Sequence, residues 1–146
     1  MARPNPTDRQ ISLTDYRALA EFRYRVRQFL RITERTARQA GVHPQQHRLM
    51  LAVEGMPAGM APSIGNLAER LQLEHHSTVE LVNRAVSRGL VARANDRHDR
   101  RVVIVRVTPR GEGLLAQLSL RNRRELQAAA PALMRALRAL TRERAS

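Results

Sequence analysis

The stretch from Ile64 to Arg110 limits most strongly what this chain can fold into. It begins with two short amphipathic helical patterns separated by a few residues. Two strand-like runs follow, the second rich in β-branched residues, and the charged, turn-prone segment 95–101 separates them. Helix, turn, helix and β-hairpin is the order of a winged helix-turn-helix. The sequence therefore predicts a mainly α fold with one small β-hairpin (α+β).

Arginine is concentrated in the second half of this stretch. Between Arg84 and Arg110 there are eight arginines and two acids, Asp96 and Asp99, which gives a local net charge of +6 in 27 residues. The whole chain of 146 residues carries +13. Such a charge favours a polyanionic partner, and duplex DNA is the one that this fold order suggests. Because all 26 basic residues are arginine, their clustering carries more weight than any single one.

Composition excludes several other classes of protein. The absence of cysteine rules out disulfides and thiol chemistry. No apolar run approaches the roughly 20 residues that span a bilayer, and the N-terminal sequence lacks the apolar core of a secretory signal. We expect a cytoplasmic protein with no membrane partner. No nucleophile–base pair, glycine-rich phosphate loop or carboxylate dyad indicates an enzyme or a cofactor.

The five histidines do not predict a metal site. His43 and His47 are four residues apart, but Pro44 marks a helix start and leaves His43 outside the regular turns. His75 and His76 are adjacent and point in different directions. No carboxylate cluster completes a ligand set.

Long amphipathic helices flank the winged stretch. Ser12 is a candidate N-cap, nothing interrupts the helical pattern up to Ala40, and Gly41 ends it. This helix of about 26 residues is too long for a small domain to cover, so we expect it in a dimer interface. It carries all four aromatic residues, which either line a ligand cavity or fill the core and interface: Tyr16, Phe22, Tyr24 and Phe29.

Start signals place the other helices. Pro44 suits the first turn of a second helix, and Ser63 caps the support helix of the helix-turn-helix. Residues 60–62 leave room for a very short strand. Thr108 followed by Pro109 begins a helix that we expect to reach about Ala128, and Pro131 is expected to open a separate last helix.

The recognition helix, from about Glu74 to Arg88, has more apolar residues than one stripe can hold. One register buries Thr78, Leu81, Val82 and Ala85, and the alternative buries Val79, Val82 and Val86. We favour the first register, which directs polar side chains outward, among them those of His76, Glu80 and Arg84.

These patterns divide the chain into three parts. Residues 1–11 are expected to be a flexible arm. Residues 12–42 and 109–146 form a helical dimerisation region, and residues 43–108 form the winged DNA-binding domain. A two-fold dimer of this kind places two recognition helices in successive major grooves of a pseudo-palindromic site.

Three motifs carry a family resemblance over roughly residues 15–140: IGNLAERL, LVNRAVSRGLVARANDRHDRR and VRVTPRGEGLL. With them the chain resembles the MarR (multiple antibiotic resistance regulator) family of bacterial transcription factors. The resemblance implies a homodimer whose first and last helices form the dimer domain. It also implies repression, or less often activation, relieved by a small molecule bound between the domains. Two departures are Ala85, where leucine is expected, and the pair His75-His76, where small polar residues are more usual.

The candidate site residues follow from these patterns and from the resemblance. The recognition-helix set is His75, His76, Ser77, Thr78, Glu80 and Arg84. The wing set is Arg97, Asp99, Arg100 and Arg101, in which the resemblance pairs Asp99 with Arg101. The candidate pocket for a small aromatic or phenolic effector is lined by Tyr16, Phe22, Tyr24 and His47. Arginine can read guanine and glutamate can accept from the cytosine amino group, whereas Arg84 can also contact phosphate or pair with Glu80.

The sequence thus predicts a DNA-binding transcriptional regulator, most simply a repressor released by a ligand. Two alternatives stay open. One is a non-specific architectural DNA-binding protein, and the other is an adaptor that uses the same fold to bind RNA or protein.

Overall fold

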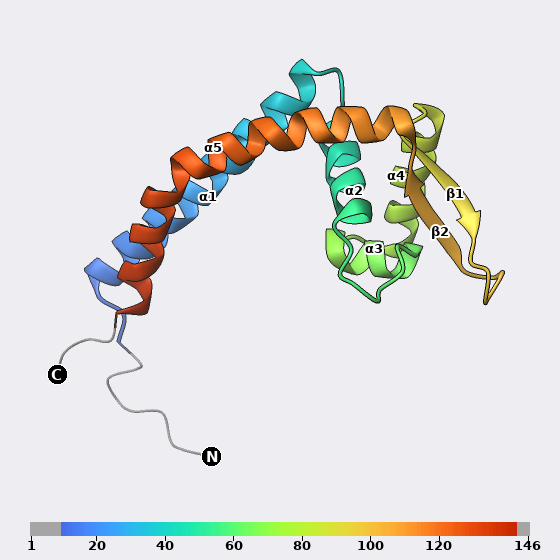
Figure 1. The fold of residues 1–146 in the computed structure, drawn as a ribbon. Helices are drawn as coiled ribbons and strands as arrows, with labels where there is room; N and C mark the ends of the chain where they lie inside the picture. The colour runs from blue at the N-terminus through green and yellow to red at the C-terminus, as the bar shows by residue number, and fades with distance from the viewer. Residues whose placement is uncertain (1–9, 143–146) are drawn as a thin grey trace, which may run out of the picture. The chain divides into compact units, whose positions relative to one another are not determined.

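A computed structural model describes residues 10–142 as five helices and one two-stranded antiparallel sheet (Figure 1). The elements in chain order are α1 (Leu13–Gln39), α2 (Pro44–Glu54), α3 (Ile64–Leu71), α4 (His75–Ser87), β1 (Val91–Asn95), β2 (Val103–Val107) and α5 (Pro109–Thr141). The predicted class, mainly α with one hairpin in a winged helix-turn-helix, is confirmed. None of the helices within these residues is long and apolar enough to cross a bilayer.

The helix starts follow the local signals of the sequence. The hydroxyl of Ser63 accepts a hydrogen bond of 3.2 Å from the backbone N–H three residues later, and that of Thr108 accepts one of 3.1 Å in the same way. Ser12 and Asp15 cap α1 reciprocally, because each side chain accepts from the other's backbone N–H. Gly41, at a φ of 76°, follows the last turn of α1. The helix starts predicted from Ser12, Pro44, Ser63 and Thr108 and the stop at Gly41 are confirmed.

One predicted boundary is wrong. The sequence suggested a helix that ends near Ala128 and a separate helix that opens at Pro131, but α5 is continuous from Pro109 to Thr141. Proline inside a helix lacks the N–H for one backbone hydrogen bond and costs about 3 kcal/mol relative to alanine. The alanines at 128–130 and the leucine-rich turns after Pro131 are strong helix formers. Their helix propensity offsets the cost of Pro131, and the helix continues past it.

The chain divides into two compact units. The winged unit is Thr33–Asn122, and the helical unit combines Met1–Ile32 with Arg123–Ser146, of which residues 10–32 and 123–142 are described. The last turns of α1 and the first turns of α5 therefore belong to the winged unit, outside the expected boundaries of 43 and 108. Most of the expected arm, residues 1–11, lies outside the described residues.

The core of the winged unit draws side chains from every element. The largest fully buried side chains are Leu49 and Met50 of α2, Leu67 of α3, Thr78 and Val82 of α4, Val91 of β1, Val105 of β2 and Leu118 of α5. Each large apolar side chain buried in this way contributes roughly 1.5–3 kcal/mol to stability. This core fixes α4 and the hairpin against the same scaffold.

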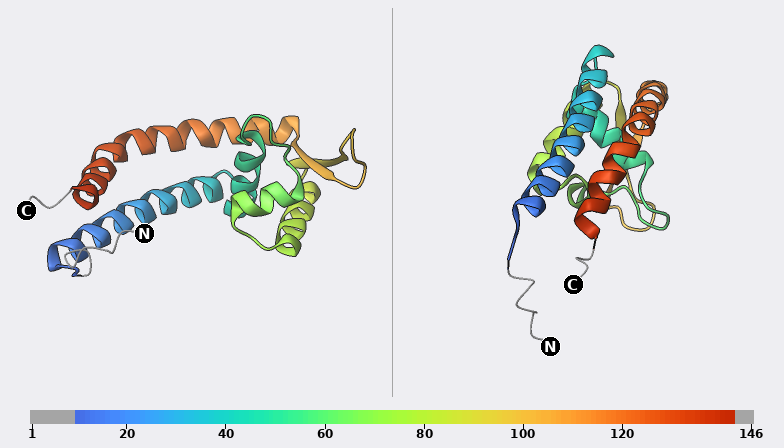
Figure 2. Two further views of the ribbon diagram at one scale, coloured as in Figure 1. Left: turned by 90° about the horizontal axis from the view of Figure 1, so that it is seen from below. Right: turned by 90° about the vertical axis from the view of Figure 1, so that its left-hand side faces the viewer.

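The hairpin is attached to the loop before α3 through β2. Its register pairs Val91 with Val107 and Asn95 with Val103. The N–H of Val105 donates to the carbonyl of Pro62 at 3.0 Å, so the loop before α3 attaches to the outer edge of β2. The very short strand expected at 60–62 is reduced to a single bridge between Ser63 and Ile104. Figure 2 shows the hairpin extending beyond α3 and α4.

Candidate nucleic-acid interface

The turn between α3 and α4 sets the direction of the recognition helix. Gln72 ends α3 in the left-handed conformation, at a φ of 56°, and the N–H of Leu73 donates to the carbonyl of Ala68 at 3.0 Å. This tight reversal lets α4 begin at His75, three residues after Gln72. The helix-turn-helix therefore has the short connection that its sequence predicted.

One face of α4 is buried and the opposite face is exposed. The buried residues are Thr78, Leu81, Val82 and Ala85, which confirms the favoured register. The exposed side chains are those of His75, His76, Glu80, Asn83, Arg84 and Ser87. Positions 76, 80, 83 and 87 recur at helical spacing and form one stripe directly opposite the buried face. Ser77 is half-buried beside this stripe.

The structure does not support Thr78 as a DNA-contacting residue. Its side chain is fully buried, and its hydroxyl donates to the carbonyl of Glu74 at 2.9 Å, one helical turn earlier. It lies on the core face of α4, so its side chain is not exposed to a ligand on the opposite side. The other five predicted residues of this helix lie on or beside its exposed face.

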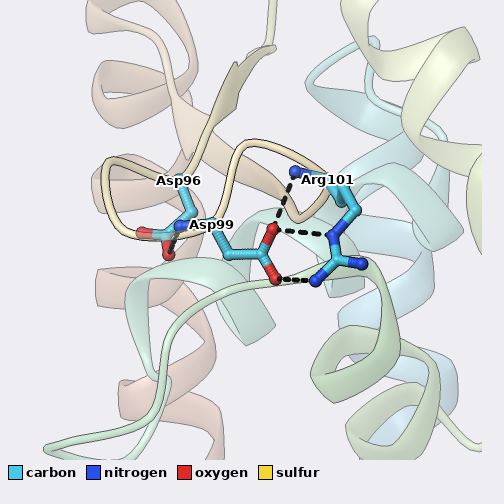
Figure 3. A network of polar contacts seen from close by, with 3 residues as sticks. All are labelled: Asp96, Asp99 and Arg101. Carbon is cyan, nitrogen blue, oxygen red and sulfur yellow. Dashed lines mark hydrogen bonds and ion pairs between the residues drawn. The ribbon is translucent and has the colours of Figure 1, made fainter.

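The tip of the wing is organised by two carboxylates (Figure 3). Asp96 accepts a hydrogen bond of 3.2 Å from the backbone N–H of Asp99, which closes the turn. Asp99 in turn accepts from the backbone N–H of Arg101 and from its Nε, both at 3.1 Å. A third bond runs from a terminal nitrogen of Arg101 to the second oxygen of Asp99 at 3.4 Å. The resemblance had suggested this pairing, and the two side chains do meet.

Electrostatics keep this pair ionised. The side-chain hydrogen bond from Arg101, followed by the backbone one, lowers the pKa of the Asp99 carboxyl below its ordinary value. The side chain of Arg101 is nevertheless 92% exposed. Asp99 therefore fixes the direction of a cation that stays open to solvent.

The arginines of this stretch lie on the surface. All eight arginines between Arg84 and Arg110 are exposed: Arg84, Arg88, Arg93, Arg97, Arg100, Arg101, Arg106 and Arg110. Arg97 and Arg100, the other predicted wing cations, thus lie at the exposed end of the hairpin. The positive charge that the sequence concentrates in this stretch is available to a polyanion.

Two residues that the sequence interpretation left out of the site join α4 to the wing. A terminal nitrogen of Arg93 in β1 donates to the side-chain oxygen of Asn83 in α4 at 2.5 Å. The helical spacing of Asn83 from His76 and Glu80 was a usable signal for its place on the exposed face. Nothing in the local sequence indicates the contact with Arg93, because it depends on how the hairpin packs against the helix.

The base of the wing is fastened to the start of α5. The hydroxyl of Thr108 donates to the carbonyl of Gly89 at 2.6 Å, and its backbone N–H donates to the carbonyl of Leu90 at 3.0 Å. Gly89 has a φ of 71°, a conformation that glycine adopts without strain. The end of α4, the wing and the first turn of α5 are therefore held as one assembly.

The candidate effector residues lie in both units. Tyr16 and Tyr24 of α1 are each 56% exposed, Phe22 is half-buried, and all three belong to the helical unit. His47 belongs to the winged unit, where it is buried and its Nε2 has no hydrogen-bond partner among the described residues. Burial, and then the positive charge of Arg48, lower the pKa of His47. The surroundings of His47 thus favour its neutral form.

Within residues 10–142 no three histidine, aspartate or glutamate side chains lie close enough together to hold a metal ion. The pair suggested by spacing, His43 and His47, is divided between two roles. Nδ1 of His43 accepts the backbone N–H of Gln45 at 3.2 Å and caps α2, whereas His47 is buried.

Comparison with known proteins shows what the winged module is similar to. A model described as "MarR family" matches residues 40–102. No protein of curated function matches the sequence.

Among solved structures the chain is similar to AbsC, a MarR family transcriptional regulator from Streptomyces coelicolor. That match has a TM-score of 0.70 and 16% identity, and it covers 83% of this chain and 81% of AbsC. A variant of MepR from S. aureus, bound to an oligodeoxyribonucleotide, has a TM-score of 0.60 and 16% identity, with 84% of each chain covered. CouR from Rhodococcus jostii, bound to p-coumaroyl-CoA, has a TM-score of 0.57 and 22% identity, with 70% of this chain and 67% of CouR covered.

At these identities the structural matches establish the fold. Helix-turn-helix, hairpin and flanking helices occur in the same order as in those regulators, and the family model covers the helix-turn-helix and the first half of the wing. The chain therefore has the fold of the MarR family transcription regulators, and its winged module, residues 40–102, matches the model of that family.

Proposed function

We propose that the chain is a sequence-specific, double-stranded-DNA-binding transcriptional regulator that acts as a homodimer on a pseudo-palindromic operator. The observation that carries this proposal is the combination of the exposed polar stripe of α4 with the Asp99–Arg101 pair on the same rigid module. One element offers groups that can read base edges, and the other offers an oriented cation for the backbone. No catalytic reaction is part of the proposal.

In this proposal α4 enters the major groove and the wing contacts the backbone or the adjacent minor groove. His76, Glu80 and Arg84 carry hydrogen-bonding groups suited to base edges. Arg97, Arg100 and Arg101 provide charge for phosphates, and an arginine at the tip can enter a narrow minor groove, where the negative potential is enhanced.

The exposed apolar surface of the helical unit supports the proposal of a homodimer. Ala136 is the one buried residue among the described residues of that unit. Its exposed large apolar side chains are Ile11, Leu13, Tyr16, Leu19, Tyr24 and Leu30 near the N-terminus, and Leu126, Met134 and Leu137 in α5. A unit with so little core of its own needs another surface to cover its apolar side chains. A two-fold dimer satisfies this need and pairs two α4 helices for two half-sites.

The geometry of the helical unit also suits a partner helix. A groove of about 380 Å³ runs between α1 and α5, with alanines at Ala18, Ala132, Ala136 and Ala139 and polar side chains along its edges. Small side chains allow close approach of a helix backbone, so this groove is a reasonable seat for part of the second copy.

We further propose that a small aromatic or phenolic molecule releases the protein from its operator. The solved structure of CouR, which shares this fold and is bound to p-coumaroyl-CoA, supports this proposal. Tyr16, Phe22 and Tyr24 of the helical unit are the residues proposed to contact it. A thermal-shift screen against phenolic and aromatic acids tests this part separately, and a flat response across a broad panel argues for a regulator without such an effector.

The central experiment is selection of duplexes from a random-sequence pool by the full-length protein, followed by binding measurements over a range of salt. We expect a pseudo-palindromic sequence to emerge and to bind at least 10³-fold more tightly than a scrambled duplex, as specific sites commonly do. Equal binding to all duplexes, with a steep salt dependence, would instead identify a non-specific architectural protein. Preferential binding of structured RNA in competition would identify an adaptor.

A further inference from the structure

Asn83 and Arg93 bridge the space between α4 and the wing. The bond from Nη1 of Arg93 to Oδ1 of Asn83 measures 2.5 Å, and both side chains are exposed rather than part of the core. It is charge-assisted, and such hydrogen bonds are about twice as strong as those between neutral groups. The contact therefore restrains the Asn83 side chain in the absence of DNA.

The chemistry of the two groups determines which way the carboxamide faces. A guanidinium carries only hydrogen-bond donors, so its partner on Asn83 must be the oxygen and not the nitrogen. With Oδ1 turned toward Arg93, the Nδ2 amino group of Asn83 points to the other side. An unrestrained asparagine would sample both orientations.

Asn83 lies where a base-contacting residue of this helix is expected. It occupies the stripe of His76 and Glu80, seven and three residues earlier, opposite the buried Leu81, Val82 and Ala85. The Nδ2 group has two N–H donors. Guanine N7 and O6, adenine N7 and thymine O4 are the acceptors that the major groove displays.

We propose that Asn83 is a further specificity-determining residue, which donates hydrogen bonds from Nδ2 to base acceptors in the major groove, and that Arg93 is the positioning residue that orients its carboxamide. The inference rests on the proposed DNA-binding function. It makes the wing responsible for part of the sequence readout by the helix, in addition to its own backbone contacts.

The competing role for Arg93 is that of a simple phosphate contact. The strand register provides a matched control. Arg93 is paired with Val105, so its side chain lies on the hairpin face that carries that buried residue, whereas Arg106 is paired with Ala92 and lies on the opposite face. Arg106 is also exposed and has the same charge, but no contact joins it to Asn83 in the described structure.

The test compares four variants of the full chain, Asn83→Ala, Arg93→Ala, the double variant and Arg106→Ala. The probes are the duplex selected by the wild-type protein and a scrambled duplex, at one fixed salt concentration. We expect Asn83→Ala to lower the ratio of selected to scrambled affinity by about fivefold or more, because one good bidentate base contact contributes at least that much discrimination. It should leave scrambled binding unchanged. Arg93→Ala should weaken scrambled binding as Arg106→Ala does, and should in addition lower the ratio.

The double variant separates positioning from charge. If Arg93 acts through Asn83, the double variant should have the same ratio of selected to scrambled affinity as Asn83→Ala alone. The effects of the two substitutions on this ratio would then be non-additive. An unchanged ratio in Asn83→Ala, or an Arg93→Ala variant indistinguishable from Arg106→Ala, would overturn the inference and leave the proposed function standing. A wild-type protein without any sequence preference would overturn both. Thermal unfolding of each variant, compared with that of wild type, verifies that these exposed substitutions keep the fold.

Discussion

Three hydrogen bonds join Arg101 to Asp99, two residues earlier in the chain. The side chain of Arg101 nevertheless remains 92% exposed. A surface ion pair of this kind contributes little to stability, because both groups are well solvated. Its effect is to hold an arginine in one direction at the tip of the wing. An ordered arginine loses less side-chain entropy when it binds a phosphate or enters a groove.

Replacement of Asp99 by alanine should therefore weaken DNA binding even though it adds one positive charge to the protein. We expect severalfold lower affinity for selected and scrambled duplexes alike, measured by fluorescence anisotropy at fixed salt. The matched control is Glu112→Ala, which removes an exposed acid from the first turn of α5. If net charge alone governed affinity, both variants would bind more tightly, and the orientation of Arg101 would be irrelevant.

The parts of this fold that could be predicted from sequence are those set by neighbouring residues. The N-caps at Ser63 and Thr108 and the left-handed Gly41 are local, and so is the spacing that buries Leu81 and Ala85 of α4. Asp99 and Arg101 were paired correctly because two residues separate them and the resemblance pointed to them.

What could not be predicted depends on contacts between distant segments. Pro131 carries a local signal for a helix start, yet the helix formers on both sides of it continue α5. The contact of Arg93 with Asn83 requires the hairpin to fold back onto α4, which no local pattern records. Thr78 was predicted both as a core residue and as a DNA contact. Its side chain is fully buried, and its hydroxyl is satisfied by the carbonyl of Glu74, so the first prediction holds.

Arg84 is expected to read a base from the exposed face of α4. If so, Arg84→Ala should cost about 1–3 kcal/mol at its own base pair, as single base contacts do, and should relax the preference at that position of the selected site. A duplex series with single base-pair changes, titrated against wild type and variant, measures this. Equal losses on all duplexes, together with a shallower salt dependence, would assign Arg84 to a phosphate.

Leu137 tests the dimer that the helical unit is proposed to form. It is 48% exposed on α5, and burial of such a side chain contributes roughly 1.5–3 kcal/mol per copy. Leu137→Asp should raise the dimer dissociation constant by two or more orders of magnitude, which sedimentation over a range of concentrations would detect. Gln127→Asp introduces the same charge at an exposed polar position of the same unit and should leave the dimer intact. Equal behaviour of the two variants would place the interface elsewhere.

Two glycines in the first turns of α5 should respond in opposite ways to alanine. A Cβ at Gly111 would lie 2.2 Å from the carbonyl oxygen of Leu90, so Gly111→Ala must push α5 away from the base of the wing. Overpacking of this kind costs about 1–3 kcal/mol. A Cβ at Gly113 meets nothing within 4 Å, and Gly113→Ala should stabilise the helix by up to about 1 kcal/mol. Urea unfolding of both variants measures the difference. Equal destabilisation by Gly113→Ala would mean that the close approach to Leu90 does not explain a loss of stability in Gly111→Ala.

His47 should make the stability of the protein depend on pH in the acidic range. Burial and the charge of Arg48 lower its pKa in the folded state, whereas the unfolded chain keeps a value near 6.5. Between these two values the unfolded chain binds more protons than the folded one, so the free energy of unfolding falls as the pH drops. Above about pH 6.5 the stability associated with neutral His47 is fully present, and it is lost as the pH falls toward the lowered value.

A non-titrating replacement of similar size, His47→Leu, should remove this part of the pH dependence. It also eliminates the buried Nε2 that lacks a hydrogen-bond partner among the described residues. Urea unfolding at intervals between pH 8 and pH 5 should therefore show a smaller loss of stability in the variant than in wild type, with a slope difference of at most about 1.4 kcal/mol per pH unit for one proton. The overall +13 charge destabilises both proteins similarly in acid, so it cancels in the comparison. Parallel profiles would mean that His47 takes up its proton equally well in the folded and unfolded chains, and would contradict the prediction.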